Sequence, residues 1–91
     1  MNNRDREIIL AALQVAHSEM RPLAEAPLHA RLNERLQAAG KLTAGLTEFE
    51  LALRAAEIEG WFTTTPAKYG SGKRWAINDA GEIARQEMER G

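Results

Sequence analysis

The fold is decided by one stretch, LTEFELALRAAEIEGWFTTTPAKYGSGKRWAI, which covers residues 46–77. Its first half carries Phe49, Ala52, Leu53 and Ala56 at the i, i+3, i+4, i+7 spacing that predicts a helix with one buried face. After Gly60 the residues become β-branched and aromatic, a composition typical of strands, and RWAI at 74–77 repeats it. We therefore expect a helix that runs directly into a β-hairpin.

Both ends of this helix carry capping signals. Thr47 followed by Glu50 three residues later is typical of a capping box, in which hydroxyl and carboxylate each accept from a free backbone N–H. Gly60 stands where a helix commonly ends in the left-handed conformation. The sequence thus predicts a helix from Thr47 to Glu59.

Two further helices are expected before this stretch. Asn3 is the predicted N-cap of the first, which ends before Pro22 because a residue that precedes proline avoids the helical region. Pro27 suits the first position of the second, whose leucine stripe ends at Gly40. Residues 21–26 between them are predicted to be a short extended link.

After the hairpin, Asn78 is the predicted cap of a final helix, DAGEIARQEMER. Its expected inner face consists of Ala80, Ile83, Ala84 and Met88. The two tryptophans, Trp61 and Trp75, flank the hairpin and are expected to form a cross-strand core pair.

Composition narrows the class of protein. Ninety-one residues predict one domain, 1–91, and the absence of cysteine excludes disulfides, thiolate metal sites and cysteine nucleophiles. The apolar run IILAAL at 8–13 is far shorter than the roughly 18 residues that indicate a membrane span. His17 and His29 lie on different predicted helices, without the partners that acid–base or metal chemistry requires. We expect a soluble cytoplasmic protein that is not an enzyme and has no cofactor.

Charge is distributed unevenly, although the net charge is only −1. Residues 47–60 hold four acidic groups and one basic group, a balance of −3. Residues 61–78 hold three basic groups and no acidic group, a balance of +3. An acidic helix is therefore followed by a basic hairpin.

Three helices, a hairpin and a closing helix, in this order, resemble the winged helix-turn-helix domain of bacterial and phage transcription regulators. The residues that carry the resemblance are LALRAAEIEGWF at 51–62 and KRWAINDAGE at 73–82. In the second segment Trp75, Ile77, Asn78 and Gly81 match the strand residues, the capping residue and the glycine of such regulators. The resemblance covers nearly the whole chain and implies an α+β fold with a two-stranded wing and a C-terminal helix.

The resemblance implies a DNA-reading helix at 47–59 and a wing at 65–74, and hence a regulator that binds double-stranded DNA, mainly through the wing. The implied DNA contacts are Thr47, Arg54, Lys68, Tyr69, Lys73 and Arg74. The helix departs from the pattern because its glutamates oppose a phosphate backbone. The final helix often dimerises in such regulators, so Ile83 and Met88 are expected either at the interface of a homodimer or docked on the first helix of the same chain.

A second function remains open from the same residues. Leu51, Ala55 and Ile58 form another apolar edge on the acidic helix. This edge is either buried against the second helix or free to meet a partner. In the latter case the chain is a protein-interaction winged helix whose acidic third helix binds a basic partner.

Overall fold

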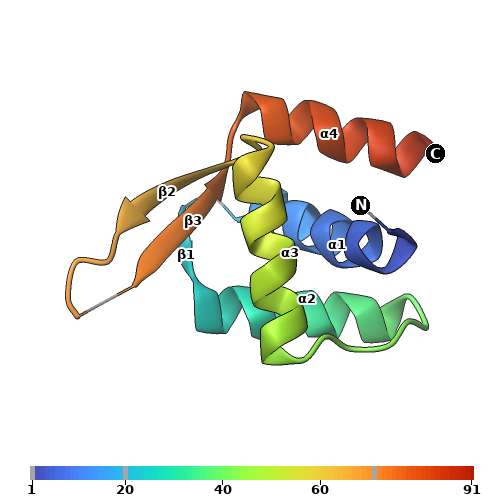
Figure 1. Cartoon of the computed structure of the whole chain (residues 1–91), viewed down its shortest axis with the longest axis horizontal. Helices are drawn as coiled ribbons and strands as arrows, with labels where there is room; N and C mark the ends of the chain where they lie inside the picture. Colours follow the sequence, from blue (N-terminus) through green and yellow to red (C-terminus); the bar gives the residue numbers. More distant parts are fainter. Residues whose placement is uncertain (1, 20, 71) are drawn as a thin grey trace.

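The computed structural model describes residues 2–19, 21–70 and 72–91. Within these ranges the chain forms four helices and one three-stranded antiparallel sheet, an α+β fold (Figure 1). In chain order the elements are α1 (Asn3–Ser18), β1 (Leu23–Ala24), α2 (Glu25–Ala38), α3 (Leu46–Ile58), β2 (Phe62–Pro66), β3 (Lys73–Ile77) and α4 (Asp79–Arg90). The predicted α+β class, helices and hairpin are confirmed.

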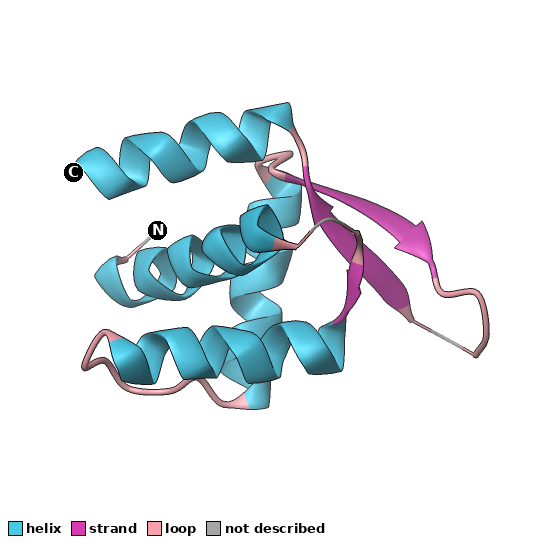
Figure 2. Cartoon of the chain, turned by 180° about the vertical axis from the view of Figure 1, so that it is seen from behind, coloured by secondary structure: helices cyan, strands magenta, loops and turns pink. Residues whose placement is uncertain are grey.

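The helices surround α1, which contacts each of the other three. Helices α4, α1 and α2 lie side by side, and α3 crosses them (Figures 1 and 2). The β2–β3 hairpin projects from the helical body on the side opposite to the two chain termini (Figure 1). No helix in the described part of the chain is both long and apolar enough to cross a membrane.

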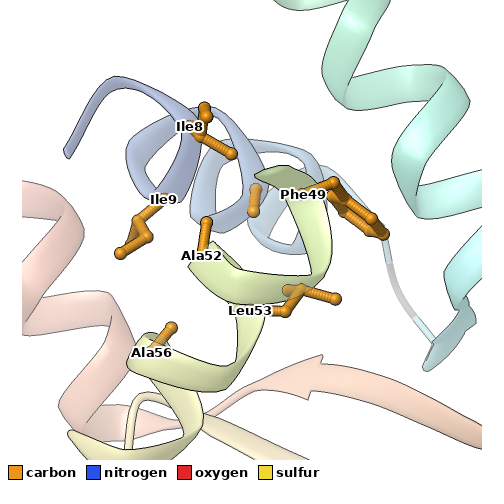
Figure 3. A pocket seen from close by; sticks show the side chains of 7 residues that line it. Ile8, Ile9, Phe49, Ala52, Leu53 and Ala56 are labelled. Carbon is orange, nitrogen blue, oxygen red and sulfur yellow. The ribbon is translucent and has the colours of Figure 1, made fainter. Parts of the chain in front are cut away.

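The core is centred where α1 and α3 cross (Figure 3). From α3 it receives the predicted stripe, and all four of its side chains are buried. From α1 it receives Ile8 and Ile9, which face that stripe in Figure 3. These described side chains leave no room for a water molecule between them. The stripe at 49–56 is therefore confirmed as the contact that joins α3 to the body.

The start of α3 differs from its prediction. The helix begins at Leu46, its N-cap is Gly45, and Thr47 is an exposed residue of the first turn, so Thr47 is not the cap. The cause lies outside the helix. Ala44 is buried, and its N–H donates to Asn33 Oδ1 of α2 at 2.7 Å, which holds the chain in place just before the helix. The C-terminal prediction is confirmed, because Gly60 has φ 80° and directly follows the C-cap residue.

The first two helices also begin earlier than predicted. Asn2 and not Asn3 caps α1, and its Oδ1 accepts from the N–H of Asp5 at 2.7 Å. Helix α2 begins at Glu25, which places Pro27 third in the helix. Proline is tolerated there because the first N–H groups of a helix have no partner within it.

The link at 21–26 contains a strand that was not predicted. Strand β1 pairs with β3, with Leu23 opposite Trp75 and Ala24 opposite Arg74, so the strand order is β1-β3-β2. The hairpin has its two predicted strands, β2 and β3, and the third strand was missed because two residues are too few to show any alternation. The pairing brings the start of α2 beside the hairpin.

The predicted tryptophan pair was also wrong. Trp75 lies opposite Thr64 of β2 and packs edge-on against Phe62, with ring centroids 5.8 Å apart. Trp61 precedes β2 and is only partly buried. The expected core position of Trp75 is confirmed, because its side chain is 4% exposed.

Helix α4 has the predicted cap but a different inner face. Asn78 Oδ1 accepts from the N–H of Gly81 at 2.8 Å. The helix is buried at Gly81 and Ala84, whereas Ile83 is 57% exposed and Ala80 is exposed as well. Gly81 explains the difference, because a Cβ at this position would lie 2.2 Å from the carbonyl oxygen of Trp61. The glycine lets α4 approach that backbone closely and turns Ile83 outward.

Candidate nucleic-acid interface

The tip of the hairpin exposes a cation and an aromatic ring. Residues 67–72 connect the strands, and the N–H of Ala67 donates to the carbonyl of Gly72 at 3.2 Å. Tyr69 is 84% exposed, and Lys68 Nζ lies 5.8 Å from its ring centroid, within reach of a cation–π contact. Ser71 of the predicted wing lies outside the described residues. The tip thus presents two of the predicted DNA contacts to solvent.

The two cations at the start of β3 have different environments. Lys73 Nζ lies 3.2 Å from Glu57 Oε2 of α3 and 5.7 Å from the ring centroid of Trp75, so its charge is partly neutralised. Arg74 is exposed, and among the described residues neither it nor Lys68 forms an ion pair. Lys68 and Arg74 are therefore the hairpin cations available to an anion.

The hairpin and the start of α2 enclose a cleft of about 350 Å³. Its lining consists of Ala24, Glu25, Ala26, Ala67, Tyr69, Gly72, Lys73 and Arg74. The first N–H groups of a helix attract anions, and α2 has no side-chain cap that would occupy them. This cleft, which we call the hairpin cleft, brings together three of the predicted DNA contacts.

The α2 side of the hairpin cleft has no signal in the sequence. Ala24 and Ala26 reach the cleft only because β1 pairs with β3. Nothing in their residue types indicates a binding role, and an alanine next to a strand is not a recognisable signal. The one sequence feature that agrees with this arrangement is the predicted extended conformation of residues 21–26, which contain β1.

A second cleft, of about 240 Å³, lies between α3 and β3 and has the opposite character. Its lining consists of Glu25, Glu50, Leu53, Arg54, Glu57, Lys73 and Trp75, which gives three carboxylates and two cations. The indole N–H of Trp75 is buried without a hydrogen-bond partner among the described residues. We call this space the acidic cleft. Arg54 lies at its wall, and Thr47 lies outside both clefts.

Arg4 of α1 pairs with one glutamate of α3, Glu48. Its Nε donates to Glu48 Oε2 at 2.9 Å, and its other nitrogens reach the carbonyls of Leu42 and Thr43 at 2.9 and 2.8 Å. This hydrogen bond is the main reason why the pKa of the Glu48 carboxyl is lowered and the pKa of Arg4 is raised. Arg4 thus ties α1 to the start of α3 and does not extend the basic surface of the hairpin.

The two histidines have structural contacts. His29 Nε2 donates to the carbonyl of Ala44 at 2.7 Å, and its ring stacks on Phe49 with centroids 4.5 Å apart. His17 Nδ1 lies 2.8 Å from Glu82 Oε2, and this hydrogen bond is the largest cause of a lowered pKa at Glu82. In the described part of the chain no three histidine, aspartate or glutamate side chains come close enough to hold a metal ion.

Comparison with protein-family models, with curated proteins and with solved structures finds no match for this chain. The chemistry of the hairpin cleft consists of two cations, a phenol and a helix N-terminus against one carboxylate. Such a set suits the oxygens of a phosphate group. The acidic cleft, with its excess of carboxylates, does not.

Proposed function

We propose that this chain is a winged helix-turn-helix protein that binds double-stranded DNA through its β2–β3 hairpin. The order of elements supports the proposal, since a hairpin follows the third helix and a capped helix closes the chain (Figure 1). Strand β1 adds to the inner edge of the sheet and leaves that order unchanged. The junction glycine of the resemblance, Gly81, has a physical reason here, namely the close approach to Trp61.

The observation that carries the proposal is the position of the hairpin cations. The hairpin projects from the helical body, and no acidic residue occurs between 61 and 78 (Figure 1). Lys73 and Arg74 line the hairpin cleft beside Tyr69 and the start of α2, while Lys68 is exposed at the tip. A phosphate seated there would meet the Arg74 guanidinium and the Lys73 ammonium next to the first turn of α2, where no side chain caps the N–H groups of Glu25 and Ala26.

We propose contact with the DNA backbone and not base reading by α3. Thr47 and Arg54 are exposed on α3 and chemically able to contact DNA. Between them stands Leu51, with Ile58 beyond, and Glu50 and Glu57 lie close by on the same helix. Carboxylates and exposed aliphatic side chains both weaken contact with a phosphate backbone. The biological role that the resemblance implies, transcriptional or phage-type regulation, remains part of the proposal.

A titration of the full chain with a labelled duplex of random sequence tests the proposal. Two unpaired hairpin cations, Lys68 and Arg74, together with Lys73, which Glu57 partly neutralises, predict a log–log salt dependence of affinity with a slope between about −2 and about −3. The double variant Lys68→Ala with Arg74→Ala is expected to reduce this slope by about 2.

The matched control is Lys41→Ala with Arg90→Ala, which removes one exposed lysine and one exposed arginine away from the hairpin. It is expected to leave the slope nearly unchanged. Absence of duplex binding at low salt, or an equal loss in the control pair, would overturn the proposal.

The homodimer also remains a proposal. Of the two residues expected at its interface, Ile83 is exposed on α4, whereas Met88 packs partly against the core. A dimer through α4 would therefore depend on Ile83. Sedimentation velocity of the wild type and of Ile83→Ser across a concentration series tests this. A dimer in the wild type and a monomer in the variant would support the α4 interface, and a monomer in both proteins would contradict it.

A further inference from the structure

The outward face of α3 carries two exposed aliphatic side chains, Leu51 and Ile58, in a line that also holds Thr47 and the cation Arg54. Thr47, Leu51, Arg54 and Ile58 follow one another at intervals of four, three and four residues, opposite to the buried stripe. This spacing is that of one seam of a helix–helix contact. Leu51 is 60% exposed and Ile58 is 78% exposed. Of the two alternatives open from the sequence, burial against α2 is thus wrong for these two side chains.

One side of this line is acidic. Glu50 and Glu57 stand one position before Leu51 and Ile58, where the flanking charges of a helix pair lie. Both also line the acidic cleft, together with Glu25 of α2. Glu57 forms an ion pair with Lys73, whereas neither Glu25 nor Glu50 forms an ion pair within the described ranges. This line is therefore bordered on its acidic-cleft side by Glu50, which has no ion pair among the described residues, and by Glu57, which is paired with Lys73.

We infer that the outward face of α3 is a docking surface for an amphipathic helix of a partner protein that carries lysine or arginine on one flank. Aliphatic side chains of that helix cover Leu51 and Ile58, and its cations face Glu50 and Glu57. One cation enters the acidic cleft, where Glu25 and Glu50 are available to it. This inference does not rest on DNA binding by the hairpin.

Charge selects this occupant over two others. A second copy of the chain, paired antiparallel through the same seam, would place the Glu50 and Glu57 flank against the same flank of the copy, and like charges at these positions repel. A DNA backbone would meet the same carboxylates. A helix with a basic flank meets opposite charge along the acidic side of the seam.

The test uses a synthetic helical peptide with leucines at i, i+4, i+7 and i+11 and lysines along one flank. A second peptide with the same leucines but glutamates in place of the lysines is the probe control. Each is titrated into the isotope-labelled full chain at low salt, with amide shifts followed by NMR. The lysine peptide is expected to bind at least about tenfold more tightly, with shifts centred on residues 47–58.

Two variants remove the proposed contacts, and two matched variants outside α3 are the controls. Leu51→Ser with Ile58→Ser, and separately Glu50→Lys, are each expected to weaken lysine-peptide binding at least about tenfold. Leu42→Ser and Glu87→Lys change exposed residues outside α3 and are expected to change it less than twofold. All of these side chains are exposed, so circular dichroism is expected to show an unchanged fold.

Several results would overturn the inference. The first is equal binding of the two peptides, and the second is a set of shifts centred away from α3. The third is a Leu51→Ser with Ile58→Ser protein that still binds the lysine peptide but has lost self-association or duplex binding. The variant Lys68→Ala with Arg74→Ala separates the two proposals. It is expected to lose salt-dependent duplex binding and to keep the peptide affinity of the wild type.

Discussion

Replacing Gly81 by alanine tests the packing of α4 against the end of α3. A Cβ at this position would lie 2.2 Å from the carbonyl oxygen of Trp61 and 2.7 Å from Cγ1 of Ile77. Ordinary contacts of this kind are well above 3 Å, so either α4 or the chain at Trp61 must move. That movement also strains the hydrogen bond from the Asn78 N–H to the Trp61 carbonyl, which is 3.3 Å long.

The expected loss can be bounded from two opposing effects. Overpacking of a well-packed site costs about 1–3 kcal/mol, and alanine recovers up to about 1 kcal/mol of helix propensity relative to glycine. Because the clash is with backbone, its cost falls in the upper part of that range, about 2–3 kcal/mol, and after the gain in helix propensity we expect Gly81→Ala to lower the free energy of unfolding by about 1–2 kcal/mol. For a domain of this size that corresponds to roughly 4–16 °C in melting temperature.

The assay is urea unfolding followed by far-ultraviolet circular dichroism, with thermal melts in parallel. Ala80→Gly is the matched control, because Ala80 is exposed in the same turn and its replacement reports helix propensity without a clash. A Gly81→Ala protein as stable as the wild type, or more stable, would refute the close approach of α4 to Trp61.

Three further predictions concern single residues. Asn78→Ala loses the cap to α4 and the hydrogen bond from Nδ2 to the Gly60 carbonyl, and is expected to cost about 1–2 kcal/mol in urea unfolding; Asn78→Asp, which keeps the cap, should cost less. Thr47→Ala is expected to stay within about 0.5 kcal/mol of the wild type by the same assay, since Thr47 caps nothing, and a loss above about 1 kcal/mol would contradict its position. The pKa values of Glu48 and Glu82 are lowered in the folded state from the ordinary value of 4.5. The contribution of these two carboxylates to the free energy of unfolding is therefore complete above that ordinary pKa and is lost as the pH falls through the lower pKa values of the folded state. Urea midpoints from pH 7 downward should therefore decline below about pH 4.5, less steeply in Glu48→Gln and Glu82→Gln; equal declines in all three proteins would contradict the ion pairs.

Local patterns were enough to predict most elements of the fold. The stripe at 49–56, the left-handed Gly60 and the Asn78 cap each depend on residues a few positions apart. Features that depend on distant residues were not predictable in this way. Thr47 failed as a cap because Asn33 of α2 holds Ala44, and β1 exists only because β3 supplies its partner.

The candidate site, like the fold, has features that follow from local sequence and features that depend on contacts between distant residues. The basic character of the hairpin follows directly from charge counts along the chain. Charge counts do not show which of these cations remain available to an anion, because the pairing of Lys73 with Glu57 and the approach of α2 to the hairpin are tertiary contacts. The outward turn of Ile83 was missed for a similar reason, since it follows from the contact between Gly81 and Trp61.

Amide shift mapping of the isotope-labelled chain with a short duplex of random sequence tests DNA binding by the hairpin most directly. At low salt the largest shifts are expected at residues 24–26, 67–70 and 72–74, which include the residues that line the hairpin cleft. They should diminish as salt is raised, since phosphate contacts are screened. The outward residues of α3 should shift little. Shifts centred on α3, or none at any salt concentration, would contradict DNA binding through the hairpin.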